Sequence, residues 1–100
     1  MTKEELLERS EFRYTKDNCK SVAKRAALIK KEENSVSYLR RIQNEIEESI
    51  NNGYMFCSVS LWEDIYLKEI VEVLRSKGFT VDMKEDSRTK NKYITVEWGD

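Results

Sequence analysis

The sequence contains no histidine, no proline, only three glycines and only two cysteines among its 100 residues. Without histidine the chain lacks the commonest general base, a frequent zinc ligand and any Ser–His or Cys–His nucleophile pair. The glycines are isolated, so no glycine-rich phosphate loop is present. We therefore expect a protein that is not an enzyme and that has no cofactor, no metal site and no catalytic residues.

Long apolar runs are also missing. No stretch approaches the ~18 apolar residues that a membrane span needs. The first five residues are mostly charged or polar and lack the apolar segment of a signal peptide. These features predict no membrane association and a cytoplasmic location.

The two cysteines, Cys19 and Cys57, both lie in apolar-patterned stretches. We expect both to be buried, reduced thiols and not a disulfide pair. Cys57 lies shortly before a predicted helix N-terminus, which is the one setting here that lowers a thiol pKa. A core position is the favoured interpretation of Cys57.

What the sequence does contain is enough apolar material for a core, 39% hydrophobic residues beside 37% charged ones. A chain of this length and composition predicts a single domain, residues 1–100, with regular elements favoured by the missing proline. Residues 1–52 read as its helical part and residues 53–100 as a β-α-β-β part. The predicted fold class is α+β, close to α/β.

Three helices are expected in the helical part. Thr2 and Glu5 form a capping box that predicts a short helix. A second helix is predicted from about residue 14 to 32, with one apolar face expected in the core: Cys19, Val22, Ala23, Ala26 and Ile29. Asn34 and Ser35 predict a break and a new cap, before a third helix over 36–50 that Gly53 terminates.

The second half predicts strand, helix, strand and strand. Residues 54–59 are nearly continuous in apolar and β-favouring residues, typical of a strand buried on both faces. Ser60 and Glu63 form a second capping box for a helix that ends at Gly78. Strands follow over 79–84 and 93–98, joined by a polar loop. We expect a small three-stranded mixed sheet, in which a parallel pair with a right-handed crossover gains an antiparallel last strand and packs against the helices.

Charge is strongly segregated along the chain. Residues 1–12 carry a net charge of −2, residues 13–41 carry +6 and residues 42–100 carry −5. The basic block defines a candidate binding surface for phosphates or for an acidic protein: Arg13, Lys16, Lys20, Lys24, Lys31, Arg40 and Arg41. The five of these basic residues that lie between positions 13 and 31 fall within roughly an 80° sector of a helix, beside the apolar face. The alternative is a solvated helix face whose lysine stems lie over apolar neighbours.

Trp62 and Tyr66 are candidate interface aromatics. On the predicted crossover helix they lie away from its main apolar stripe. Large aromatics in such positions anchor protein interfaces. They equally suit a helix that is covered on two sides, in which case they pack on the N-terminal helices.

Residues 42–98 resemble small accessory proteins of phages and prophages. The resemblance is carried by three stretches: Ile46-x3-Ile50-x2-Gly53, Leu74-x3-Gly78-Phe79-x-Val81 and Tyr93-Ile94-x-Val96-x-Trp98. It implies a protein that acts in the host cytoplasm by binding a host component, and it carries over no catalytic residues.

The leading functional hypothesis is a small non-enzymatic binding or regulatory protein, of an inhibitor or anti-defence type, that binds a host protein or self-assembles. A second hypothesis is a nucleic-acid-binding accessory protein that uses the basic helix 13–31. A third is a sponge for a small anionic nucleotide, held at an interface between copies.

Overall fold

The computed structural model describes residues 1–99 and has the α+β architecture that the sequence predicts. Three helices and three strands follow one another along the chain: α1 (Lys3–Ser10), α2 (Lys16–Asn51), β1 (Phe56–Ser60), α3 (Leu67–Ser76), β2 (Thr80–Glu85) and β3 (Lys92–Glu97). Thr2 caps α1 by accepting a 3.2 Å hydrogen bond from the amide of Glu5, so the predicted helix start at Thr2 is confirmed.

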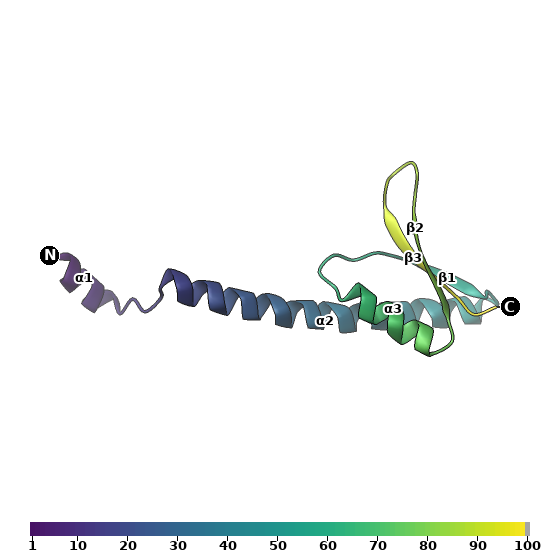
Figure 1. The fold of residues 1–100 in the computed structure, drawn as a ribbon, viewed down its shortest axis with the longest axis horizontal. Helices are drawn as coiled ribbons and strands as arrows, with labels where there is room; N and C mark the ends of the chain where they lie inside the picture. The colour runs from purple at the N-terminus through teal and green to yellow at the C-terminus, as the bar shows by residue number, and fades with distance from the viewer. Residues whose placement is uncertain (100) are drawn as a thin grey trace.

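The molecule is elongated because α2 runs far beyond the rest of the fold (Figure 1). Its 36 residues correspond to about 54 Å of helix. The radius of gyration is 21.8 Å, against about 13 Å for a compact chain of this length. We call residues 35–99 the head, which contains the packed elements, and residues 1–34 the arm, which projects from it.

The sheet is antiparallel throughout, with strand order β1-β3-β2. The predicted mixed sheet with an adjacent parallel pair is therefore wrong. β1 and β2 do run in the same direction, but β3 lies between them and hydrogen-bonds to both. Cys57 and Val81 both pair with Val96 in this register. The arrangement is a split β-α-β unit, in which the last strand fills the gap left by the α3 crossover.

One face of the sheet forms the core together with α2 and α3. The core contains buried side chains from every element of the head: Tyr38, Ile42, Cys57, Val59, Ile65, Ile70, Leu74, Val81, Ile94 and Val96. In β1 burial alternates strictly, with Cys57 and Val59 inside and Phe56 exposed. The prediction that this strand is buried on both faces is wrong, because β1 is an edge strand whose second face is open to solvent.

α2 is continuous through Asn34 and Ser35, so the predicted break is wrong. Ser35 is buried, and its hydroxyl donates a 2.8 Å hydrogen bond to the carbonyl of Lys31 one turn earlier. A serine that bonds back to the preceding turn is compatible with a helix interior. The helix ends as predicted, since its last residue is Asn51 and Gly53 adopts a left-handed φ of 78°.

The second capping box is also wrong. Residues 61–66 form a loop, and α3 begins at Leu67 with Tyr66 in the cap position and no side-chain cap. The loop turns at Asp64, where φ is 52°. Gly78 follows the end of α3 with φ of 93°, so the predicted helix stop there is confirmed.

Candidate binding surface

Three hydrogen bonds join α2 to the end of β1 and to the loop over residues 61–66. The amide of Tyr66 donates to the Ser35 hydroxyl at 2.8 Å, and the Tyr38 hydroxyl donates to the carbonyl of Ser60 at 3.0 Å. The side-chain amide of Asn34 donates to the carbonyl of Asp64 at 3.3 Å. Burial raises the pKa of Tyr38 from 10.0 to about 12, so its phenol keeps its proton and this bond above pH 10, where an exposed tyrosine ionises.

Both candidate interface aromatics face α2. The ring of Trp62 lies 5.0 Å from that of Tyr38, centroid to centroid, and Trp62 stays 40% exposed. The Lys31 ammonium lies 4.7 Å from the centre of the Tyr66 ring, a cation–π contact. Trp62 and Tyr66 thus help to attach the head to the helix, and neither lies on a crossover helix as the sequence suggested.

The structure brings together only part of the predicted basic surface. Lys16, Lys20, Lys24 and Lys31, here called the basic stripe, lie within about 80° of one another on α2. Arg13 precedes the helix, and Arg41 forms a 3.0 Å ion pair with Glu45 farther along it. Arg40 is exposed on a different side of α2. The four lysines continue the side of α2 that carries Tyr38 and Ile42, which is the side the head covers.

The apolar face predicted for the core lies on the opposite side of α2 and is exposed. Val22 is 57% exposed, Ile29 50% and Val36 51%. We call this surface the rear face and define it by residues spaced alternately three and four apart: Cys19, Val22, Ala26, Ile29, Glu33 and Val36. Its centre lies about 180° from the Tyr38 side. The prediction that this face is buried, and that Cys19 is buried, is wrong because the head docks on the other side.

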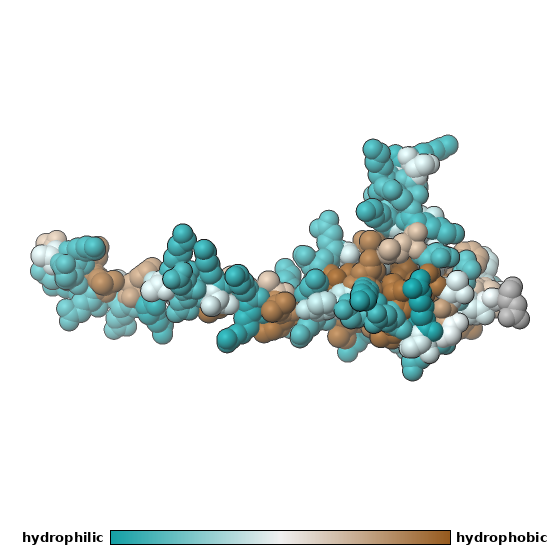
Figure 2. All heavy atoms as spheres, in the orientation of Figure 1, coloured by the Kyte–Doolittle hydropathy of each residue, from teal (hydrophilic) through white to brown (hydrophobic). Residues whose placement is uncertain are grey.

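More exposed apolar side chains lie at the start of the arm. Leu6 and Leu7 on α1 are 59% and 54% exposed, and Phe12 and Tyr14 in the connection to α2 are 65% and 58% exposed. The Phe12 and Tyr14 rings meet edge to face, with centroids 6.5 Å apart. Figure 2 shows the largest brown area over the head and smaller brown patches along the arm. The arm therefore presents apolar surface that the described residues do not cover.

The two thiols differ in setting. Cys19 lies exposed on the rear face, and Cys57 is 4% exposed in the core. Burial raises the pKa of the Cys57 thiol, and the nearby Glu45 carboxylate adds to the rise. The sequence suggested that a helix N-terminus could lower the pKa of Cys57, whereas the structure raises it.

Concave surface is shallow. A notch of about 460 Å³ lies where the arm meets the loop, lined by Lys24, Ala27, Leu28, Lys30, Lys31 and Asp64. Within residues 1–99 no three acidic or thiol groups lie close enough to hold a metal ion. No helix in the described part combines the length and apolar character of a membrane span.

The sequence reasoning identified the lysines and four of the six rear-face residues, but placed the stripe beside the apolar face. It assigned Val36 to a separate helix because of the predicted break at Asn34, and it did not include the charged Glu33. The alternating three–four spacing through residue 36 was the available signal. Comparison of the chain with protein-family models, with curated proteins and with solved structures found no match.

Proposed function

We propose that this protein is a non-enzymatic binding protein that contacts another protein chain through its arm. The observation that supports this most is the exposed rear face, where Val22, Ile29 and Val36 stay at least half exposed although they repeat along one side of a long helix. A sustained apolar stripe on a soluble helix is the usual sign of a helix that packs against a partner.

The division of the chain supports the same proposal. The head satisfies its own core, and within residues 1–99 every buried side-chain nitrogen or oxygen has a hydrogen-bond partner. The arm has none of this packing, since its residues from 16 to 30 are all exposed. A helix without tertiary contacts gains little stability from helix propensity alone. Packing against a partner would therefore stabilise an arm of this length.

The experiment compares the mass in solution of three proteins and their capture of partner proteins from lysate. Wild type, the double variant Val22→Lys/Ile29→Lys and the control Lys24→Glu are compared by sedimentation over a wide concentration range, then by capture from host lysate. The control changes a charge on the opposite side of the same helix. Association that the double variant loses and the control keeps supports the proposal. A monomer that captures nothing, or association that the double variant retains, contradicts it.

A second candidate function is binding of nucleic acid by the basic stripe. Lys16, Lys20 and Lys24 lie in line along the free part of α2, and none of them forms an ion pair with a described residue. Binding to duplex DNA should then weaken with salt, with a log–log slope of about −0.9 per phosphate contact. Lys20→Glu/Lys24→Glu should abolish binding, whereas Val22→Lys/Ile29→Lys should not. Unchanged binding by the first variant rules this surface out.

Three further proposals rest on the sequence alone: phage origin, an inhibitor or anti-defence role, and the nucleotide sponge. No contact or cavity of the described residues favours one of them over the others.

A further inference from the structure

We propose that the occupant of the rear face is a second copy of this chain, whose α2 lies antiparallel to the first, with Arg25 of each copy opposite Glu32 of the other. This rests on the proposed function, because it names the partner of the same arm surface. Four features of the chain lead to it. They are the heptad spacing of the rear face, the side of α2 that the head occupies, the charges beside the rear face, and the register in which these charges pair.

The rear face follows a coiled-coil heptad through almost three repeats. Cys19, Ala26 and Glu33 occupy the a positions, and Val22, Ile29 and Val36 occupy the d positions. Apolar residues repeating every 3.5 positions form the contact seam between two supercoiled helices; five of these six positions are apolar, and Glu33 is the charged exception. The small side chains at 19 and 26 allow a close approach of two backbones.

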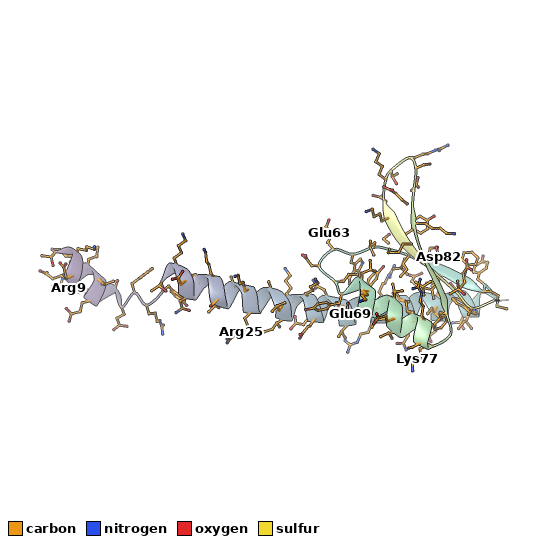
Figure 3. All side chains as sticks on the ribbon, viewed as in Figure 1. Arg9, Arg25, Glu63, Glu69, Lys77 and Asp82 are labelled. Atoms are coloured by element: carbon orange, nitrogen blue, oxygen red, sulfur yellow. The ribbon has the colours of Figure 1, made fainter. Side chains whose placement is uncertain are left out.

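The head leaves this side of α2 open to solvent, although Val36 at its end lines a hollow together with Tyr66, Glu69 and Val73 of the head. The head packs on α2 through Ser35, Tyr38 and Ile42, whose side lies about 180° from the rear face. In Figure 3, Arg25 extends from the side of α2 away from the loop that carries Glu63. Two copies can therefore meet rear face to rear face with both heads on the outside.

The charges beside the seam select the antiparallel orientation. Arg25 and Glu32 occupy the g positions and Lys30 an e position. In a parallel pair each g residue faces the e residue of the next heptad in the other copy. Arg25 of each copy would then face Lys30 of the other, which gives two repulsive contacts. In an antiparallel pair g faces g, which allows two Arg25–Glu32 contacts. Interhelical pairs at these positions set orientation.

The same charges select one register. When Ala26 of one copy lies level with Ile29 of the other, Arg25 lies opposite Glu32 on both sides of the two-fold axis. A shift of one heptad in either direction places Arg25 opposite Arg25, or Glu32 opposite Glu32. Neither residue forms an ion pair within the described chain. In the selected register Cys19 of each copy lies level with Val36 of the other.

Cross-linking tests orientation and register together. Val36→Cys adds a thiol 17 positions beyond Cys19, about 25 Å along the same helix, too far for a short bifunctional thiol reagent to join within one chain. Cys57 is buried. We expect a covalent dimer from Val36→Cys, because Cys19 of one copy lies level with the thiol introduced at position 36 of the other. We expect none from wild type or from Cys19→Ser/Val36→Cys, because the only exposed thiol of one copy then lies about 25 Å from the same thiol of the other copy.

Charge reversal tests the pairing. Arg25→Glu and Glu32→Arg should each weaken self-association about tenfold at low ionic strength, since each turns two attractive pairs into repulsive ones. The double variant should restore association, and a mixture of the two single variants should form a mixed dimer. Lys24→Glu is the matched control and should change little. Circular dichroism checks that every variant stays folded.

Cross-linking of wild type or of Cys19→Ser/Val36→Cys would overturn the antiparallel arrangement in favour of a parallel one. Association that is lost in Val22→Lys/Ile29→Lys, without any cross-link in Val36→Cys, would overturn this register and leave the arm as a contact surface. A chain that stays monomeric at every concentration but captures another protein through its arm would overturn the second copy as partner and leave the proposed function standing.

Discussion

The hydroxyl of Ser35 accepts a 2.8 Å hydrogen bond from the backbone amide of Tyr66 while donating one of equal length to the carbonyl of Lys31. One side chain inside α2 thereby fixes Tyr66, the residue in the cap position of α3. This hydrogen bond is one of the contacts that hold the loop before α3 on the long helix.

Replacing Ser35 with alanine removes both hydrogen bonds and leaves the Tyr66 amide without a partner in a half-buried site. We expect the free energy of unfolding to fall by about 1–3 kcal/mol. Urea denaturation followed by circular dichroism measures it. Ser37→Ala, an exposed position on the same helix, is the control and should change stability by less than about 0.5 kcal/mol. Equal effects at both positions would contradict the role of Ser35.

Tyr38→Phe removes the hydrogen bond to the carbonyl of Ser60 and should cost about 0.5–1.5 kcal/mol at pH 7. The wild-type advantage should vanish at high pH. The folded pKa of Tyr38 is about 12, above the unfolded value near 10, so above pH 10 the unfolded chain releases a proton that the folded chain retains. Wild type therefore loses stability between pH 10 and pH 12, and the variant lacks this loss. Parallel curves for the two proteins would contradict the buried setting.

Ile94 and Met83 face each other across β3 and β2, yet Ile94 is fully buried and Met83 is 60% exposed. Ile94→Ala should lower the free energy of unfolding by about 2–5 kcal/mol through lost packing and a cavity. Met83→Ala should stay within about 0.5 kcal/mol. Thermal or urea unfolding compares the two, and a large effect at Met83 would mean that this end of the sheet is covered.

Alkylation should distinguish the two thiols. At high dilution Cys19 should react at the rate of an exposed thiol, because no described side chain covers it. Cys57 should react only as fast as the head opens, since burial blocks access and raises its pKa. Mass spectrometry after timed iodoacetamide treatment counts the adducts. Two equally fast adducts would contradict the core position of Cys57.

Local signals predicted much of the secondary structure. Gly53 and Gly78 mark the two helix ends because each adopts a positive φ that favours glycine. The alternation of Ile94, Val96 and Trp98 correctly identified the last strand, because side chains on one face of a sheet repeat every second residue, although Thr95 on the other face is buried too.

Features set by tertiary contact were missed. Ser35 and Ser60 both resemble helix caps in sequence, but Ser35 instead bonds to the loop before α3, and Ser60 is the acceptor for Tyr38. The position of β3 between β1 and β2 leaves no local pattern, since the sequence of a strand does not identify the strands that it pairs with. The rear face of α2 was recognised as apolar, but periodicity does not show whether an apolar face is covered by its own chain.

The central claim is that the arm is a contact surface for a second copy of the chain, and amide hydrogen exchange tests it most directly. Residues 16–30 are all exposed in the single chain, so amides of peptides from this segment should exchange quickly at low protein concentration. We predict that their protection rises with concentration in wild type, stays low in Val22→Lys/Ile29→Lys, and that protection of the head stays constant. Arm amides that exchange at one rate from dilute to concentrated wild-type protein would contradict the claim.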